Sequence, residues 1–425
     1  MNTSKRVVVL GGARIPFVKS FAQYSGVTNP ELMTFVLQKL VAKYKLQGKL
    51  LGDVALGCLL QNPKDWNMAR ESVLSSGLDP NTPAYNVQRA CGTSLETALQ
   101  ISLKIAAGQI ECGIAGGTDS NSDVPIAITR KAQNKLLNVN KAKSAIDKAK
   151  ALLHLRPTDL LLDIPGIKEP RTGLSMGEHC ELMVKEWKIS REAQDELTYA
   201  SHQNAVKAYK DGFFNDLVHE FKKVKQDTIV RADTTLERLA KLKPVFDRSA
   251  SGTLTAGNSS SLSDGASAVL LSSEEWATKN QLPILADFVD AQSAAMDFVH
   301  GEGLLMAPTV AVSELLKRQG LTLQDFDFYE IHEAFAGQVL CTLKAWESEK
   351  FCREKLNREK PLGSIDRSKL NVAGGSVALG HPFAATGTRI VATLAKLLNQ
   401  KGKGRGIISV CTAGGMGVAA ILEKK

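Results

Sequence analysis

Two segments in the last quarter of the chain carry residues suited to acyl-transfer chemistry. His381 follows a small-residue turn at 374–380, and Cys411 ends an apolar run just before a second glycine turn at 413–417. An imidazole and a thiol can move protons to and from a carbonyl substrate, but a covalent mechanism also needs a nucleophile. The rest of the chain has to supply that nucleophile.

Cys91 is the candidate nucleophile because it lies at a predicted strand-to-helix junction. The unpaired N–H groups and the positive end of the helix dipole at such a junction favour a thiolate. Gly92 should keep the sulfur accessible. The other cysteines before Cys411 have no such junction, and we interpret each of them as a small buried side chain. These are Cys58, Cys112, Cys180, Cys341 and Cys352.

A second histidine and a polar run are further candidates. His332 follows a predicted strand at 326–331 and precedes a helix, where α/β folds place functional groups. A purely structural histidine is the alternative. The run of small polar residues at 252–261 is either a plain loop or a polar wall around an amide-containing ligand, and the local sequence favours neither.

Strand and helix patterns alternate along the chain, which predicts an α/β layer architecture around a buried sheet. The expected strands are 6–10, 54–60, 268–271, 326–331, 406–410 and 418–422, and the expected helices are 30–44, 68–74, 95–108, two within 176–212, 308–318 and 388–398. Cys91 and His381 each open a helix that leads to a strand and a glycine turn, at 116–117 and 414–415. This weak repeat predicts two similar halves.

Composition indicates a globular chain in a reducing compartment. Of 425 residues 44% are hydrophobic, and no apolar run reaches the roughly eighteen residues of a spanning helix. Gly11-Gly12 interrupts the first apolar run, so we expect a strand there and no secretory signal. The seven cysteines are scattered and never form a CxxC pair, so we expect no disulfide framework, no metal site and a cytoplasmic location.

The net charge of +9 suggests an anionic partner. Nucleic acid is the least favoured, because basic and aromatic residues do not interleave. A phosphate-bearing cofactor or an anionic lipid surface remains. Residues 131–168 are rich in lysine and leucine, and we interpret them as a solvated helical cap in preference to a surface that meets lipid or another subunit.

Several short motifs, taken together, resemble those of the thiolases over nearly the whole chain. They are Cys91-Gly92-Thr93-Ser94, Met176-Gly177-Glu178, 252–258, His332-Glu333-Ala334-Phe335, Gly380-His381-Pro382 and 411–417. His332 stands where most thiolases have asparagine, and this resembles the branch of the trifunctional-complex β subunits. Thr412-Ala413 departs from the family's double glycine, although Ala413 still offers a backbone N–H.

The resemblance implies a five-layered αβαβα core of two duplicated halves with an inserted loop domain. The expected boundaries are 1–120 and 250–282 for the N-terminal half, 121–249 for the loop domain and 283–425 for the C-terminal half. It further implies CoA thioesters as substrates, coenzyme A as a substrate with no permanently bound cofactor, a homodimer or homotetramer, and a role in fatty acid β-oxidation. A hydratase/dehydrogenase α subunit and a peripheral membrane contact are possible partners.

The resemblance also assigns roles to residues. Cys91 is the nucleophile, His381 activates it, and Cys411 is the general acid and base. One oxyanion hole is formed by the His381 side chain and a group held at His332. The other is formed by the backbone N–H groups of Cys91 and Ala413. The expected CoA contacts are Ser260 to the pantetheine amide and Met176, Leu304 and Phe335 as apolar walls.

Three other functions stay open. A biosynthetic acetyl-CoA C-acetyltransferase would run the same chemistry in reverse. A ketoacyl synthase could use Cys91, His332 and His381, but its decarboxylation needs no second thiol such as Cys411. A non-catalytic scaffold subunit is disfavoured because all four of these side chains are intact.

Overall fold

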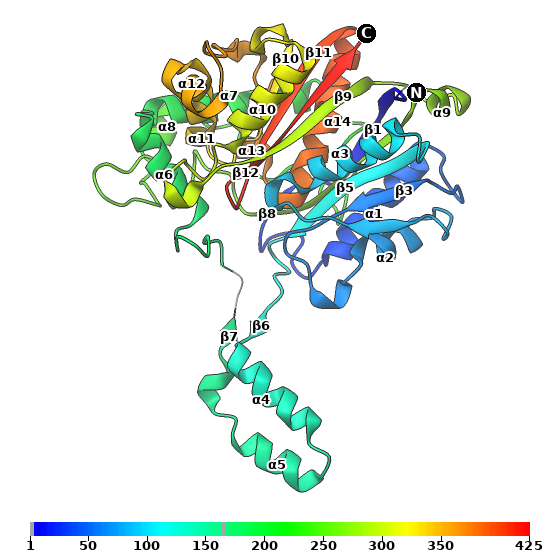
Figure 1. Cartoon of the computed structure of the whole chain (residues 1–425), viewed down its shortest axis with the longest axis vertical. Coiled ribbons are helices and arrows are strands. Elements are labelled where there is room, and N and C mark those ends of the chain that lie inside the picture. Colours follow the sequence, from blue (N-terminus) through cyan, green and yellow to red (C-terminus); the bar gives the residue numbers. More distant parts are fainter. Residues whose placement is uncertain (1–3, 164–165) are drawn as a thin grey trace.

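The computed structural model describes residues 4–163 and 166–425. Its centre is one ten-stranded mixed sheet in the order β10-β11-β12-β9-β1-β8-β5-β3-β4, with β2 paired to β8 (Figure 1). The strands are β1 Val7–Arg14, β2 Val18–Lys19, β3 Asp53–Leu56, β4 Ala84–Asn86, β5 Cys112–Ser120, β8 Ser263–Ser273, β9 Ala286–Ala295, β10 Phe328–Ile331, β11 Gly404–Thr412 and β12 Met416–Lys424.

The sheet has two halves, joined where β1 pairs with β9, and helices form three layers around them. Between the halves lie α3 (Thr93–Ala106) and α14 (Thr386–Lys401), whose apolar side chains share one core with both. The outer layers are α1 (Asn29–Lys43) and α2 (Met68–Leu74) on one half, and α10 (Ala307–Gln319), α11 (Ala336–Glu347) and α12 (Glu349–Leu356) on the other. This is the expected five-layered α/β core.

Local sequence accounts for the helix boundaries. Thr28 caps α1 in a capping box with Glu31, and the Ser190 side chain caps α7 (Arg191–Lys210). Gly320 ends α10 in the left-handed conformation that glycine adopts without strain. The strand predicted at 54–60 is shorter in the structure, where it ends at Leu56. The remaining helices are α6 Met176–Glu186, α8 Leu236–Ala240, α9 Glu274–Lys279 and α13 Ser376–Leu379.

The prediction of a turn at Gly116-Gly117 is wrong. Both glycines lie inside β5, which is buried along its whole length. A Cβ on Gly117 would stand 2.2 Å from the carbonyl oxygen of Ala384. Gly117 therefore lets the short segment after His381 lie directly on the strand, which is a packing requirement and not a turn signal.

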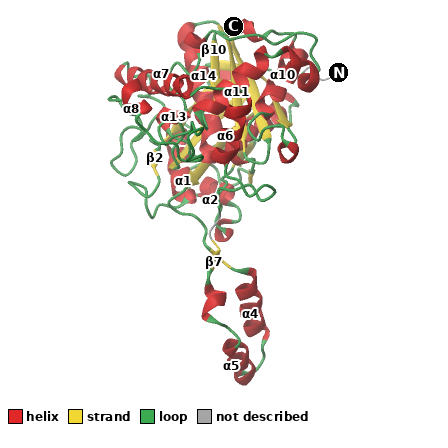
Figure 2. Cartoon of the chain, turned by 90° about the vertical axis from the view of Figure 1, so that its left-hand side faces the viewer, coloured by secondary structure: helices red, strands yellow, loops and turns green. Residues whose placement is uncertain are grey.

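The lysine- and leucine-rich excursion is a helical hairpin that projects away from the body of the molecule (Figures 1 and 2). Helices α4 (Arg130–Lys141) and α5 (Ala145–Leu153) pack on each other, and the short strands β6 (Ala127–Ile128) and β7 (Leu162–Asp163) form its stem. The hairpin is helical as predicted, and Ala132 is the one buried residue among its two helices, but it does not cover the core as a cap would. Residues 164 and 165 of the excursion lie outside the described residues.

Among the residues that the structure describes, no helix is both long enough and apolar enough to cross a bilayer.

Candidate active site

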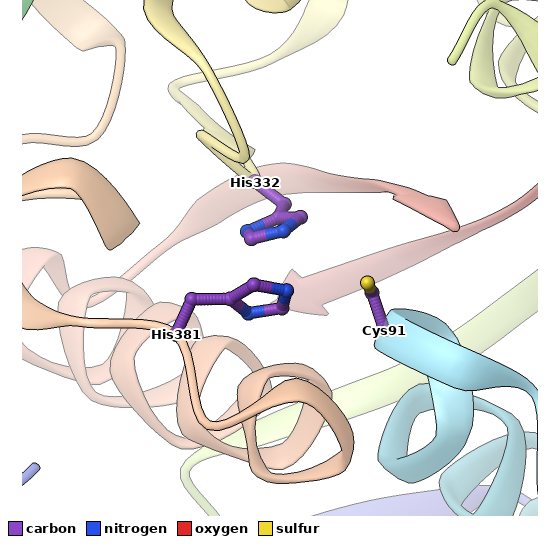
Figure 3. Close-up of side chains that lie close together, drawn as sticks. All are labelled: Cys91, His332 and His381. Carbon is purple, nitrogen blue, oxygen red and sulfur yellow. The ribbon is translucent and has the colours of Figure 1, made fainter. Parts of the chain in front are cut away.

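Three side chains that are far apart in the sequence lie close together in the structure (Figure 3). The Cys91 sulfur and one ring nitrogen each of His332 and His381 all lie within 4.8 Å of one another. The two imidazole rings have centroids 4.1 Å apart and planes tilted by 46°. The fold thus brings together the predicted nucleophile and both predicted histidines.

The position of Cys91 depends on a tight turn at the start of α3. The 3-10 turn Ala90–Gly92 precedes the helix, and Ala90 has a φ of +43°, a left-handed conformation that costs a non-glycine residue free energy. The Thr93 hydroxyl stabilises the turn, because it accepts from the Arg89 N–H at 2.8 Å and donates to the Ala90 carbonyl at 2.7 Å. Gly92 is required for packing, since a Cβ there would stand 2.8 Å from the Thr412 side chain.

Each histidine is held through its Nδ1 atom. His332 follows β10, and its Nδ1 lies 2.8 Å from the Ser376 hydroxyl. The Nδ1 of His381 lies 2.6 Å from the hydroxyl of Thr386, the first residue of α14. Both Nε2 atoms are buried and without a hydrogen-bond partner among the described residues. Unpaired buried nitrogens are costly, so these atoms indicate positions where a substrate bonds.

Burial keeps all three groups neutral. It raises the pKa of the Cys91 thiol to about 12, although the backbone N–H groups of Ala413 and Cys91 itself lower it. Burial and the Arg389 charge lower the pKa of His381 to about 3, and burial with the charges of His381 and Arg389 lowers that of His332 well below its ordinary range. The N–H groups at the junction favour a thiolate as expected, but they do not produce one by themselves, because desolvation outweighs them.

Cys411 and Ala413 come to the site from β11 and from the turn that joins β11 to β12. Cys411 is buried on β11, opposite Gly417 of β12, and burial and the neighbouring Cys91 raise its pKa well above the ordinary value of a thiol. It is therefore protonated and suited to donate a proton. The Ala413 backbone N–H lies close enough to the Cys91 thiol to lower its pKa, and its part in an oxyanion hole stays a prediction.

The predicted CoA contacts lie near this site. Met176, Leu304 and Phe335 pack in one apolar cluster with Cys411. The backbone N–H of Ser260 donates to the Ala334 carbonyl at 2.9 Å, which holds the polar run beside the strand end that carries His332. Contact of these four residues with a ligand stays a prediction.

Sequence analysis missed a pocket on the same side as the polar run. Its volume is about 230 Å³, and it reaches Val377, next to Ser376. Polar lining residues are His202, Arg231, Asp233, Thr234, Arg238, Ser259 and Ser261. The arginines stand in a segment without periodicity, and only the fold shows that they face the serines.

The same three donors, two imidazoles and a thiol, are also of the types that bind Zn²⁺. The expectation that no metal is bound stays a prediction, and metal analysis of the purified protein tests it.

Comparison with known proteins identifies the family to which the chain is similar. Residues 7–275 match the family pattern described as Thiolase, N-terminal domain, and residues 282–424 match Thiolase, C-terminal domain. A 3-ketoacyl-CoA thiolase from Yersinia pestis (strain Pestoides F) is 41% identical over 424 residues, which are 98% of this chain and 97% of that relative. The solved acetyl-CoA acetyltransferase of Bacillus anthracis matches with a TM-score of 0.82 and 31% identity over 100% of both chains. The human mitochondrial 3-ketoacyl-CoA thiolase in complex with CoA matches with a TM-score of 0.82 and 29% identity, covering 99% of this chain and 98% of that chain.

Proposed function

Because this chain belongs to the thiolase family, we propose that it is a 3-ketoacyl-CoA thiolase acting in fatty acid β-oxidation. It would cleave a 3-oxoacyl-CoA with free CoA into acetyl-CoA and a shortened acyl-CoA. The observation that carries the proposal is the convergence of Cys91, His332 and His381, with Cys411 beside them. This set supplies a nucleophile, a base, a hydrogen-bond donor and a separate acid.

In the first half-reaction, the Cys91 sulfur attacks the 3-keto carbon while its proton passes to His381. A concerted transfer is required because burial keeps the thiol protonated and the imidazole neutral. The bond between the second and third acyl carbons then breaks, and its electron pair forms the enolate of acetyl-CoA. Cys411 protonates the enolate carbon and becomes a thiolate.

In the second half-reaction, the Cys411 thiolate takes the thiol proton of incoming CoA. The CoA sulfur attacks the acyl group on Cys91, and the Cys91 sulfur leaves and recovers its proton from His381. The backbone N–H groups of Cys91 and Ala413 would stabilise one oxyanion, and His381 with His332 the other. Removal of such a donor typically lowers the rate about a hundredfold or more.

Thiolysis of purified 3-oxoacyl-CoA substrates of several chain lengths by free CoA tests this function. We expect acetyl-CoA and a shortened acyl-CoA as products, identified by chromatography. Condensation from a malonyl thioester without any cleavage would instead identify a ketoacyl synthase. A preference for acetoacetyl-CoA over all longer substrates would favour the second candidate, an acetyl-CoA C-acetyltransferase like the Bacillus anthracis protein.

We propose that the pocket beside Val377 holds the phosphates of CoA. Arg231 and Arg238 supply positive charge, although Arg238 is paired with Asp233 of the same pocket, and Ser259 and Ser261 supply hydroxyl groups on its wall. A charge-assisted hydrogen bond contributes on the order of 2 kcal/mol. Arg238→Ala should therefore raise the KM for CoA about tenfold or more, with kcat changed little.

Steady-state kinetics with CoA and with dephospho-CoA measure this effect. Arg353→Ala is the matched control, because Arg353 is exposed on α12 and pairs with Glu349 away from the pocket. If Arg238 binds the ribose phosphate, the change is confined to CoA; if it binds the diphosphate, both ligands are affected. An unchanged KM for both would contradict the pocket assignment.

The projecting hairpin is proposed to contact an anionic lipid surface. Residues 130–156 contain eight basic side chains and one acidic one, which accounts for most of the net charge. Large apolar side chains are exposed beside them, namely Leu136, Leu137, Ile146, Leu152 and Leu153. Basic and apolar groups together fit a headgroup boundary better than a purely solvated surface.

Deletion of residues 130–156 should abolish sedimentation with vesicles of phosphatidylcholine and phosphatidylglycerol and leave thiolysis unchanged. Vesicles of phosphatidylcholine alone are the control. Binding that survives the deletion, or that ignores lipid charge, would contradict the proposal. Loss of complex formation with a hydratase/dehydrogenase α subunit, with vesicle binding intact, would assign the hairpin to that partner.

We also propose an oligomeric state, domain boundaries and a cellular location. A homodimer or homotetramer and the domain boundaries at 120, 249 and 282 rest on resemblance to the family. A cytoplasmic location rests on the scattered, unpaired cysteines.

A further inference from the structure

A buried polar chain stands behind His332, and the mechanism above does not use it. The Arg389 Nη2 atom on α14 donates to the Ser376 hydroxyl at 2.7 Å, and the same hydroxyl lies 2.8 Å from His332 Nδ1. All three residues are at most 2% exposed. They come from different parts of the C-terminal half of the chain, so the fold alone brings them into line.

The direction of these hydrogen bonds follows from the donor types. A guanidinium can only donate, so the Ser376 oxygen accepts from Arg389. The hydroxyl proton then has one acceptor within reach among the described residues, namely His332 Nδ1. If Nδ1 carried a proton instead, the Ser376 proton would be buried without a partner, at a cost in free energy.

We infer that Arg389 is a positioning residue that acts through Ser376 and fixes His332 in the tautomer with its proton on Nε2. That N–H then faces Cys91 and His381, where it can donate to the oxygen of the bound thioester. The inference rests on the proposed thiolase reaction. It explains how a histidine can serve at a position where most thiolases have asparagine. An asparagine amide has a fixed donor and needs no such device.

The surroundings keep Arg389 charged and Ser376 in place. Burial lowers the pKa of the Arg389 guanidinium to about 10, and the charges of the buried Glu330 and Glu333 side chains oppose this shift, so Arg389 stays charged at neutral pH. Glu333 accepts from Ser201 at 2.7 Å, from Asn371 at 2.6 Å and from the Val377 N–H at 3.1 Å, which fixes the turn that carries Ser376. A Cβ on Gly375 would stand 2.1 Å from the Glu333 carboxylate, so this contact requires glycine.

The tautomer can be observed directly by ¹⁵N NMR of protein labelled at histidine, with His332→Asn identifying the signals. We expect Nε2 protonated and Nδ1 unprotonated in the unmodified protein. In Ser376→Ala, which removes the hydroxyl proton that Nδ1 accepts, we expect a mixture of the two tautomers. A protonated Nδ1 in the unmodified protein would overturn the inference whatever the enzyme's activity.

Kinetics supply the second test. Ser376→Ala should lower kcat about tenfold to a hundredfold with KM changed little, since a misdirected oxyanion donor is partly lost. In a His332→Asn background the same substitution should lower kcat by a much smaller factor, because the asparagine amide has no tautomer to fix. An equal fold-loss in both backgrounds would show a merely structural role and refute the inference.

Two further measurements keep the outcomes separate. Thermal unfolding identifies a variant that fails to fold. Ser376→Ala is preferred to a change at Arg389 because Arg389 is both buried and charged. Absence of thiolysis by the unmodified protein would refute the proposed function, whereas the NMR result stands independently of it.

Discussion

Cys91→Ala should lower the rate of thiolysis by about ten-thousandfold or more while leaving the fold intact. The acyl-enzyme bond can form only at this sulfur, and loss of a covalent nucleophile removes the two-step pathway entirely. Stability should change little, because a smaller side chain replaces a partly exposed one at a turn that Thr93 holds. Thiolysis of a 3-oxoacyl-CoA and thermal unfolding measure the two effects.

Cys352→Ala is the matched control, because Cys352 is buried on α12 outside the site and should leave the rate nearly unchanged. Iodoacetamide provides a check on the unmodified protein. Cys91 is the one cysteine of the seven that keeps some solvent exposure, so it should be alkylated first. Full thiolysis by the alkylated protein or by Cys91→Ala would contradict a covalent mechanism.

The pH dependence of this alkylation follows from the site's burial. A thiolate is the reactive form, and burial raises the Cys91 pKa to about 12. The rate should therefore keep rising with pH above 8.5, the ordinary pKa of a thiol, where an unperturbed cysteine would level off. A plateau below neutral pH would show a preformed thiolate and would contradict the concerted proton transfer.

Cys411→Ala should lower thiolysis about a hundredfold to ten-thousandfold, the usual range for a general acid and base. Without Cys411 the acetyl-CoA enolate has no proton donor, and incoming CoA has no base. Acylation chemistry at Cys91 should persist, so iodoacetamide should still alkylate that residue. Exchange of the acetyl-CoA methyl hydrogens with deuterated solvent isolates the proton-transfer step and should be lost.

Cys341→Ala is the control for this variant, because Cys341 is buried in the same apolar cluster as Cys411. It reproduces the packing loss without removing the acid. Exchange or thiolysis that continues at the full rate in Cys411→Ala would contradict the assigned role and would make the second thiol dispensable, as in a ketoacyl synthase.

The sequence predicted most elements because their signals are local. The apolar period of α14, the N-cap at Ser190 and the glycine at 320 each depend on residues within a few positions. The turn predicted at Gly116-Gly117 is wrong because Gly117 lies against Ala384, which is more than 260 positions away in the sequence. A one-dimensional pattern cannot distinguish a turn from such a close approach.

For the site, residue types and neighbouring motifs alone identified Cys91, His332, His381 and Cys411 as candidates. Tertiary structure decided their protonation and their neighbours. Desolvation keeps Cys91 a thiol against the local preference of its helix, because burial depends on the whole fold. The Arg389–Ser376–His332 chain and the arginine-lined pocket likewise depend on contacts between distant segments, which propensity and spacing do not encode.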